Sequence, residues 1–314
     1  MPDIAAKKFF VGRDYLCLQD YTPEEILYML KVAKELKEER KAGIPHPILQ
    51  GKILAMIFTK SSTRTRVAFE AGMLQLGGHA LFLSNRDIQI GRGEPIKDTA
   101  RVLSRMVDGI MIRTYDHQDV VELAEYATVP VINGLSDFLH PTQVLADLLT
   151  IQEHKKRLKG LKMTYIGDGN NMANSLMFAG KMGMHVVIAS PPDYKPDAQL
   201  FAKASEQAKQ NGGLVEWMED PLLAAKNADV LYTDVWASMG QEDEAEIRMQ
   251  AFQGYRIDGE TMKQAHPEAI VLHCLPAHRG EEITEEVFEG PQSVVFDEAE
   301  NRLHAHKAIM ALLL

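Results

Sequence analysis

The sequence has few cysteines, no long apolar run and no excess of basic residues. Its two cysteines, Cys17 and Cys274, cannot form a disulfide framework in 314 residues, which indicates a reducing compartment. No stretch approaches the roughly 18 consecutive apolar residues of a membrane span, and the first residues lack the apolar core of a secretory signal. The 34 basic residues are outnumbered by 44 acidic ones, giving a formal net charge of -10 at pH 7. This argues against nucleic acid or an acidic membrane as partner, so we expect a cytoplasmic, soluble protein that binds any anion locally.

The apolar content, 46% of the chain, is high enough for a large core, and the length favours two domains. Short apolar runs alternate with helical patterns, which is typical of parallel sheets with helical crossovers. The predicted buried strands fall into two sets, residues 53–58, 81–83, 109–112 and 129–132, and then 163–166, 186–189, 230–232, 270–272 and 294–296. The predicted fold class is therefore α/β, with two doubly wound parallel-sheet domains.

Helix signals place the domain boundary. Thr22 and Glu25 form the pattern of a capping box before an apolar-periodic stretch. A second helical pattern covers residues 141–159, and we place the boundary inside it, so that residues 1–148 form one domain and 149–297 the other. The helical stretch 298–314 is expected to pack back on the first domain. Residues 240–248 are polar enough for a mobile loop.

Residues 61–66, Ser-Ser-Thr-Arg-Thr-Arg, follow the first predicted strand and precede a helical pattern. Free backbone N–H groups, hydroxyl donors and guanidinium groups at a helix N-terminus are what a phosphate group requires. The pattern predicts a phosphate site, and the alternative is an N-cap with two solvated arginines.

A second segment, His140-Pro141-Thr142-Gln143, follows the strand at 129–132 and the turn-like Asn133-Gly134. His140 and Gln143 then lie where a ligand at the strand ends would bind, although both could simply satisfy loop backbone. Arg113, which ends the strand at 109–112, is a further cation at the same sheet edge, or a solvated arginine.

In the second half, Gly167-Asp168-Gly169-Asn170-Asn171 follows a strand but lacks the glycine spacing of a dinucleotide site. Adjacent asparagines suit a polar small molecule such as an amino acid, or a plain turn. Asp234, after the strand at 230–232, could pair a ligand ammonium or cap a loop. Cys274, between His273 and His278, could be a nucleophile, a metal ligand, an orienting group or an inert buried residue, and the lack of a second cysteine nearby argues against zinc.

Together these segments resemble the aspartate/ornithine carbamoyltransferase family over essentially the whole chain. The resemblance rests on Ser62-Thr63-Arg64-Thr65 and on His140-Pro141-Thr142-Gln143 in this order. His273-Cys274-Leu275-Pro276, together with Asp234 followed by Ser238-Met239-Gly240, looks like the ornithine branch of the family.

The resemblance implies a carbamoyl phosphate-binding domain (1–148) and an ornithine-binding domain (149–297), joined by interdomain helices with the active site in the cleft. The residues expected to bind carbamoyl phosphate are Ser62, Thr63, Arg64, Thr65, Gln89, Arg113, His140, Gln143, Cys274, Leu275 and Arg302. The residues expected to bind ornithine are Asn171, Asp234, Ser238 and Met239. Arg64, Arg113, His140 and Cys274 are the expected catalytic residues. The family also implies a homotrimer, or a multiple of trimers, in which a neighbouring subunit borders each site.

The implied reaction is transfer of the carbamoyl group to the side-chain amine of L-ornithine, giving L-citrulline and phosphate, with arginine biosynthesis as the expected role. It needs an uncharged amine and a stabilised tetrahedral oxyanion, but no metal and no organic cofactor. The proton of the amine could pass to Cys274 or to the departing phosphate. The alternatives are a carbamoyltransferase for another amine, such as putrescine or acetylornithine, a non-catalytic carbamoyl phosphate sensor, and a nucleotide-binding oxidoreductase.

Overall fold

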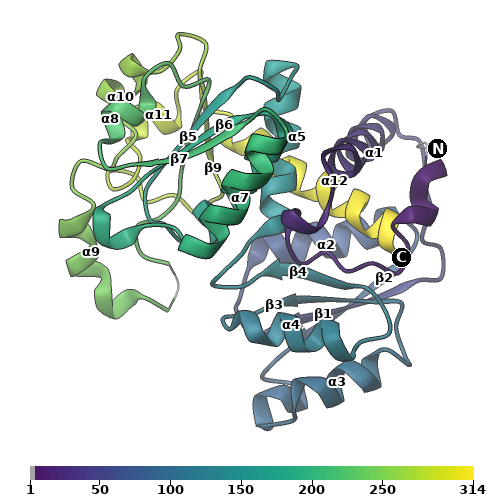
Figure 1. Cartoon of the computed structure of the whole chain (residues 1–314). Coiled ribbons are helices and arrows are strands. Elements are labelled where there is room, and N and C mark those ends of the chain that lie inside the picture. The colour runs from purple at the N-terminus through teal and green to yellow at the C-terminus, as the bar shows by residue number, and fades with distance from the viewer. Residues whose placement is uncertain (1–3, 239) are drawn as a thin grey trace. The chain divides into compact units, whose positions relative to one another are not determined.

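The computed structural model describes residues 4–238 and 240–314, and the chain divides into two compact units (Figure 1). Unit 1 contains the chain up to residue 149 together with residues 300–314, and unit 2 contains residues 150–299. Both boundaries fall inside helices, α5 (Pro141–Lys155) and α12 (Val295–Leu313). The chain therefore passes between the units twice, each time within a helix.

Unit 1 is built on a four-stranded sheet in which every pair of neighbours is parallel. Its strands are β1 (Ile53–Phe58), β2 (His79–Ser84), β3 (Gly109–Arg113) and β4 (Val131–Leu135). The spatial order is β2-β1-β3-β4. The chain goes outward from β1 to β2 and then returns past β1 to β3, so the winding direction reverses between β1 and β3. In open α/β sheets such a reversal opens a crevice at the carboxyl ends of the two strands.

Helices cover both faces of this sheet. They are α1 (Pro23–Lys41), α2 (Thr63–Gln75), α3 (Ile96–Leu103), α4 (His117–Tyr126) and the first part of α5, with short 3-10 turns η1 (Ala5–Phe9), η2 (Leu18–Asp20) and η3 (Gln89–Arg92). In Figure 1, α1, α2 and α12 lie on one face of the sheet and α3 and α4 on the other. The predicted capping box at the start of α1 is confirmed, because the Thr22 hydroxyl accepts from the Glu25 N–H and the Glu25 carboxylate accepts from the Thr22 N–H.

Unit 2 repeats this arrangement with five parallel strands. They are β5 (Lys162–Ile166), β6 (His185–Ala189), β7 (Leu214–Met218), β8 (Val230–Thr233) and β9 (Ile270–His273). The spatial order is β7-β6-β5-β8-β9, so here the winding direction reverses between β5 and β8.

The helices of unit 2 complete the α/β pattern. They are α6 (Asn171–Leu176), α7 (Ala198–Gln210), α8 (Pro221–Ala225), α9 (Ala245–Ala251), α10 (Gly259–Gln264) and α11 (Glu285–Phe288), with the 3-10 segments η4 (Met177–Met182), η5 (Pro192–Tyr194) and η6 (Glu242–Glu244). One core cluster joins the sheet to α8 and α11 through buried Ile166, Ala224, Val271 and Val287. The prediction of two parallel-sheet α/β domains is confirmed.

One predicted strand is absent, and one strand of the structure was not predicted. Residues 294–296 form no strand, because α12 begins at Val295, and Phe296 is 62% exposed whereas Val295 is buried. Asp297 and Glu298 stand in the first turn of α12, where carboxylates favour a helix. Conversely, β7 was missed, since it is an edge strand whose first residue, Leu214, is largely exposed and whose apolar run is broken by Glu216.

Other expected boundaries also moved. Asn133 and Gly134 do not form a turn but lie buried inside β4, where the Asn133 side chain donates to the Leu16 carbonyl. The helix predicted over residues 141–159 ends at Lys155, and Lys156 takes a left-handed conformation with φ of 62°. The polar segment 240–248 contains η6 and the start of α9.

Within the part of the chain that the structure describes, no helix has both the length and the apolar character of a membrane-spanning segment.

Helices α2 and α12 pack closely inside unit 1. Phe69 of α2 stacks on His306 of α12, with ring centroids 4.2 Å apart and an interplanar angle of 22°. His306 has no exposed surface, and neither of its ring nitrogens has a hydrogen-bond partner among the described residues. Burial, followed by the charge of Arg302, lowers the pKa of His306 well below its usual range. The imidazole therefore acts as a neutral aromatic ring at pH 7.

We expect His306→Phe to reduce the acid sensitivity of the fold. Because the pKa of His306 is depressed in the folded state, the unfolded chain gains a proton first as the pH falls below about 6.5, and stability is lost. One such histidine accounts for about 1.4 kcal/mol of the stability difference between pH 7.5 and 5.5. Urea denaturation at both pH values should show a difference smaller by about that amount in the variant. An unchanged difference would contradict the assignment of a neutral buried imidazole.

Candidate functional site

The loop after β1 leads directly into α2, and its hydroxyls organise the start of that helix. Ser62 is the N-cap residue, and its Oγ accepts a hydrogen bond from the Thr65 backbone N–H over 3.2 Å. Thr63, Arg64 and Thr65 then form the first turn of α2. In this turn the backbone N–H groups lack intrahelical partners, and the helix dipole is positive. The four residues expected from the sequence thus lie together at an anion-attracting helix end.

The Thr65 hydroxyl is the point where two arginines meet. Its Oγ1 accepts from Nη2 of Arg302 at 2.7 Å and from Nη1 of Arg113 at 3.4 Å. Arg113 is the last residue of β3 and Arg302 lies on α12, yet both are at least 94% buried, as is Thr65. A fully buried hydroxyl next to two buried guanidinium groups forms a strongly positive site beside the reversal between β1 and β3.

His140 adds a neutral group to this positive cluster. It immediately precedes α5 and is 4% exposed. Burial, followed by the charges of Arg302 and Arg113, lowers the pKa of His140 well below its usual range. At pH 7 the imidazole is therefore uncharged and can donate one hydrogen bond without adding a positive charge.

Gln143 is bonded to another side chain, whereas Arg64 keeps an unused donor. The Gln143 amide donates to Oδ1 of Asp147 at 2.8 Å, and both side chains are fully buried. Arg64 is only partly buried, but its Nε is inaccessible to solvent and has no hydrogen-bond acceptor among the described residues. Arg64 thus carries a donor that a bound anion could satisfy.

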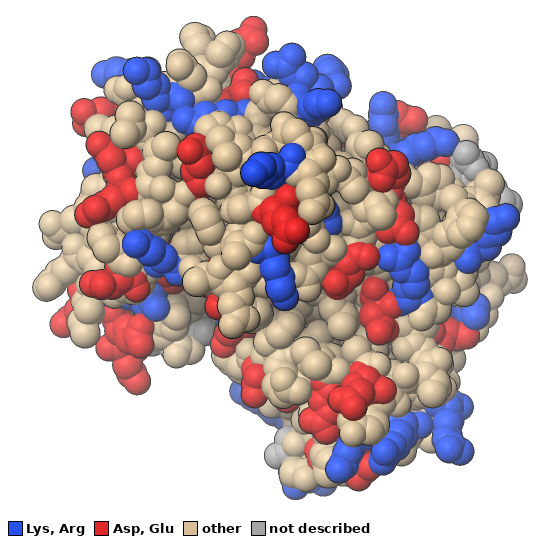
Figure 2. All heavy atoms as spheres, in the orientation of Figure 1, with Lys and Arg blue, Asp and Glu red and all other residues tan. Residues whose placement is uncertain are grey.

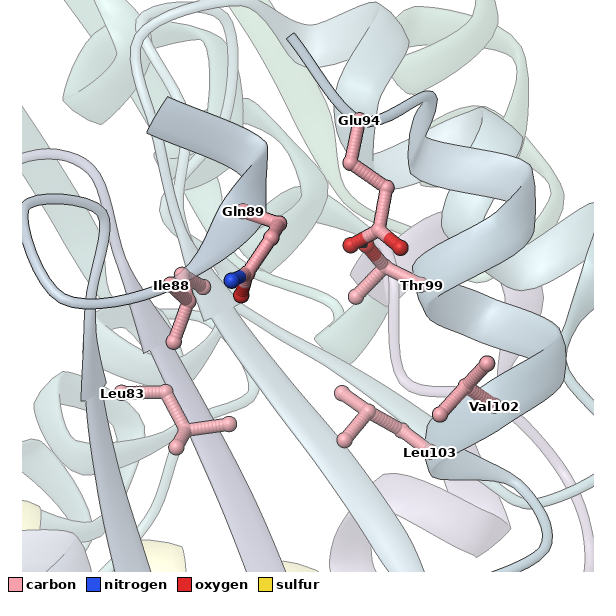
Figure 3. Close-up of a pocket in the computed structure, with 7 residues that line it drawn as sticks. All are labelled: Leu83, Ile88, Gln89, Glu94, Thr99, Val102 and Leu103. Atoms are coloured by element: carbon pink, nitrogen blue, oxygen red, sulfur yellow. Dashed lines mark hydrogen bonds between the residues drawn. The ribbon is translucent and has the colours of Figure 1, made fainter. Parts of the chain in front are cut away.

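Gln89 lies apart from the Thr65 cluster. It begins η3 and lines a pocket of about 250 Å³, shown in Figure 3. The other lining residues are Leu83, Ile88, Glu94, Thr99, Val102 and Leu103. In Figure 3 Leu83 and Ile88 face Val102 and Leu103 across the pocket, while Thr99 donates to Glu94 at 2.9 Å. This pocket is mainly apolar and includes no residue of the α2 N-terminus.

In unit 2 the strand ends gather acidic and amide groups. Asn170 is the N-cap of α6, its Oδ1 accepting from the N–H groups of Met172 and Ala173, and its Nδ2 donates to Oδ2 of Asp234 at 3.0 Å. Asn170 follows β5 and Asp234 follows β8, so this bond spans the reversal of the sheet. Asn171, the residue expected from the sequence, is the next residue and is 8% exposed. The adjacent asparagines are visible in the sequence, but the bond by which Asn170 orients Asp234 is not.

Cys274 completes this cluster from β9. Its thiol donates to Oδ1 of Asp234 at 3.0 Å, and the same oxygen accepts from the Val235 N–H at 2.8 Å. Asp234 is 6% exposed, so a buried carboxylate is held by three donors from three strand ends. A fixed carboxylate of this kind can pair a ligand ammonium group.

Next to Cys274, the backbone of Leu275 is held in a left-handed conformation with φ of 60°. Its N–H donates to Nδ1 of His273, which places the His273 proton on Nε2, and Nε2 donates to the buried Glu282. Asp234, His273 and Cys274 offer ligand atoms within 4.8 Å of one another, as a metal site would. Because both His273 nitrogens already serve in hydrogen bonds, this histidine supports the Leu275 backbone rather than ligating a metal.

The segment after β8 is anchored by an arginine that the sequence analysis missed. Arg248 donates through Nη1 to Asp168 at 2.7 Å and to the Trp236 carbonyl at 3.1 Å, and through Nε to Glu244 at 2.9 Å. Burial raises the pKa of Asp168 to about 6, and Arg248 limits that rise. Ser238 lies within this anchored segment, and Met239 lies outside the described residues.

Charges of both signs are mixed over the face drawn in Figure 2, with no wide field of Lys and Arg. This agrees with the net charge of -10. Attraction of an anion thus depends on the buried arginines beside Thr65 rather than on the overall charge.

Asn170→Asp should test the arrangement around Asp234. The new carboxylate keeps the helix cap but stands about 3 Å from Asp234, and two such groups cannot both stay ionised without cost. We expect a loss of about 2 kcal/mol in the free energy of unfolding at pH 7.5. The two neighbouring carboxylates should raise the pKa of one of them in the folded state. The loss of stability should therefore shrink toward pH 4.5, where that group is protonated.

Urea denaturation at the two pH values measures this effect, with Asn170→Ser as control. Serine keeps a cap acceptor without a second charge, so its smaller loss should not depend on pH. If Asn170→Asp showed no pH dependence, the close contact with Asp234 would be refuted.

The fold and these clusters define an α/β protein with an arginine-rich anion site in one unit and a buried acid held by amide and thiol donors in the other. Two family models divide the chain in α5 in nearly the same way, although the second model also includes residues 300–313 of unit 1. Residues 13–153 match the model described as "Aspartate/ornithine carbamoyltransferase, carbamoyl-P binding domain", and residues 159–313 match "Aspartate/ornithine carbamoyltransferase, Asp/Orn binding domain". The chain belongs to the aspartate/ornithine carbamoyltransferase family.

Individual relatives are similar over nearly their whole length. A protein of Pyrococcus abyssi named ornithine carbamoyltransferase is 60% identical over 304 residues, covering 96% of both chains. One of Pyrococcus furiosus, named as the anabolic ornithine carbamoyltransferase, is 59% identical with the same coverage. The solved structure of an ornithine carbamoyltransferase from Pyrococcus furiosus superposes with a TM-score of 0.94 at 58% identity, covering 96% of this chain and 97% of that one.

Proposed function

We propose that this protein is an ornithine carbamoyltransferase, which transfers the carbamoyl group of carbamoyl phosphate to the side-chain amine of L-ornithine. The observation that carries the proposal is the Thr65 hydroxyl, which accepts hydrogen bonds from Arg113 and Arg302 at the N-terminus of α2. The names of the relatives support the choice of ornithine as acceptor, and the anabolic relative supports arginine biosynthesis as the role.

Carbamoyl phosphate is assigned to the cluster around Thr65. The N–H groups of Thr63 and Arg64, with the side chains of Ser62 and Arg64, would hold the phosphate and stabilise the charge that grows as the C–O bond breaks. The buried Nε donor of Arg64 supports this role. Arg302 would contribute its charge from α12.

The carbonyl oxygen of the carbamoyl group is assigned to Arg113, His140 and Thr65. Donors that are fixed before the reaction stabilise a tetrahedral oxyanion at little reorganisation cost. The low pKa of His140 supports a neutral donor, since burial and two arginines oppose its protonation. Gln89, Gln143, Cys274 and Leu275 complete the predicted set, and Gln143 would have to leave Asp147 or bind through its remaining atoms.

Ornithine is assigned to the cluster around Asp234, with Asn171, Ser238 and Met239. The Asp234 carboxylate would pair an ammonium group of the substrate, and Asn171 would bind the α-carboxylate end. Cys274 donates to the same carboxylate, so it would orient the attacking amine. The amine attacks the carbamoyl carbon and the C–O bond to phosphate breaks. The amine proton passes to the departing phosphate, or to the Cys274 sulfur as the thiol proton moves to Asp234.

The homotrimer is proposed for the assembly. Exposed apolar side chains of unit 1 support it, since Val67 and Leu74 of α2 and Leu81 of the neighbouring β2 are 46–65% exposed. A contiguous patch of exposed apolar groups is typical of a surface that binds another protein. The cytoplasmic location remains a prediction.

Light scattering of the purified protein should give a mass of three 35.1 kDa chains or a multiple of it. Leu74→Glu should lower that mass, because a charge would be buried in the interface. Leu223→Glu, at a similarly exposed leucine of unit 2, is the matched control and should leave the mass unchanged. A monomeric wild-type protein would contradict the trimer.

The catalytic proposal is tested by measuring product formation from carbamoyl phosphate with ornithine, putrescine, acetylornithine and aspartate side by side. We expect strong preference for ornithine. Arg64→Ala should lower kcat/KM for carbamoyl phosphate by about 100-fold, the order seen when one transition-state donor is removed. Arg66→Ala is the control. It removes an exposed arginine two residues further along α2 that pairs with Glu70, and it should have little effect.

Activity with another acceptor would keep the carbamoyl phosphate site but overturn the assignment of the Asp234 cluster. Binding of carbamoyl phosphate without transfer to any acceptor would favour a non-catalytic sensor.

A further inference from the structure

A buried lysine lies at the end of β1, just before the predicted phosphate loop. The Lys60 side chain is only 4% exposed, and its Nζ lies 2.7 Å from Oδ1 of Asp137. The same Nζ stands 4.8 Å from the centre of the Tyr115 ring. A lysine is rarely buried this deeply unless it is paired, and here the Asp137 carboxylate is its partner.

The Lys60–Asp137 pair crosses over a strand. In the sheet order β2-β1-β3-β4, β3 separates β1, which precedes Lys60, from β4, which precedes Asp137. The loop of β3 lies between them and is bonded to both sides. The Lys60 N–H donates to the Arg113 carbonyl at 3.3 Å, and the Asp137 N–H donates to the Tyr115 carbonyl at 3.0 Å.

Each of the three connected loops carries a proposed ligand of carbamoyl phosphate. The β1 loop leads to Thr65 at the start of α2, β3 ends on Arg113, and the β4 loop leads to His140.

The β4 loop is also stiff between Asp137 and His140. The Ser136 N–H donates to the Leu139 carbonyl, and the Ser136 hydroxyl accepts from the N–H groups of Phe138 and Leu139. A displacement of Asp137 would therefore be passed on to His140.

We propose that the Lys60–Asp137 pair is a positioning device that holds the phosphate-binding start of α2 in register with Arg113 and His140, which bind the carbamoyl group. This inference rests on the proposed function of the Thr65 cluster. It makes Lys60 and Asp137 positioning residues, because each acts through the loops and not on the substrate.

The opposing reading makes Lys60 a direct phosphate ligand that Asp137 restrains. The two readings predict opposite changes in carbamoyl phosphate affinity for Asp137→Asn. Removal of an acid beside an anion site should strengthen anion binding if Lys60 were freed to bind phosphate. If the pair positions the loops, the same change should weaken the binding of a ligand that needs all three loops.

The test is calorimetric titration of the full-length protein with fresh carbamoyl phosphate and with inorganic phosphate. For Asp137→Asn and for Lys60→Met we expect the Kd of carbamoyl phosphate to rise about tenfold, the order found for directly coupled residues. The Kd of inorganic phosphate should change less than about twofold, because phosphate lacks the carbamoyl group and needs only the α2 end. The double variant should be no weaker than the weaker single variant.

Lys60→Arg keeps the charge and its reach, so it should restore most of the affinity. Asp98→Asn is the matched control, since Asp98 is a half-exposed carboxylate paired with Arg101 in the same unit. The melting temperature of each variant is measured to check that the variant is folded. If Asp137→Asn does not fold, Asp137→Glu, which shifts the carboxylate by one methylene, should show a smaller loss in the same direction.

Tighter binding of carbamoyl phosphate by Asp137→Asn, equal losses for both ligands, or additive losses in the double variant would overturn the proposal. These outcomes are separate from the proposed function. If the wild-type protein bound carbamoyl phosphate but carbamoylated no acceptor, the reaction assignment would fail while the titrations still decided the role of the pair.

Discussion

The hydrogen bonds from Arg113 and Arg302 to the Thr65 hydroxyl determine much of unit 1. Two guanidinium groups that are almost fully buried repel each other, and burial away from water makes each of them costly unless it finds acceptors. One hydroxyl, in the first turn of α2, accepts from both. Arg302 can reach this point only because α12 packs tightly on α2, with His306 stacked on Phe69 one turn further along. The packing of two helices thus controls where the positive charge stands.

Unit 2 also has a reversal of winding direction in its sheet, but the buried group there is negatively charged. A carboxylate, Asp234, stands at the reversal of its sheet and accepts from Asn170, Val235 and Cys274. Because the three donors come from loops after β5, β8 and β9, the carboxylate is fixed by the sheet itself. An acid held in this way suits a cationic amino acid, whereas the arginines of unit 1 suit an anion. The two units therefore divide the chemistry of the proposed reaction by charge.

Local electrostatics outweigh the overall charge of the protein. The net charge of -10 would repel a phosphate compound at long range, but screening limits that repulsion to about 10 Å at ordinary salt. Inside the fold, His140 stays neutral because burial and its arginine neighbours oppose protonation. Lys60 is neutralised by Asp137. The positive charge that remains beside Thr65 is that of arginines, which no physiological pH removes.

Hydrophobic periodicity and capping patterns are local properties, so eight of the nine strands in the described part of the chain, several helices and the motifs could be predicted from the sequence. The capping box at Thr22 and the α/β class followed from such patterns, and Ser62, Thr63, Arg64 and Thr65 were placed correctly at a helix start. Local patterns failed where tertiary contacts decided. The run at 294–296 became the start of α12, and Asn133 entered β4 because Leu16 accepts from its side chain.

Which strand ends meet depends on strand order and helix packing, which no local pattern encodes. The order β2-β1-β3-β4 brings Thr65 to Arg113, which is 48 residues away, and α12 adds Arg302 from 237 residues away. The supporting roles of Asn170, Arg248 and Lys60 could not be predicted for the same reason, since each role depends on a partner on another loop. A sequence shows the chemical type of each side chain, but strand order and helix packing set the distances between side chains, and those distances determine hydrogen bonds and pKa values.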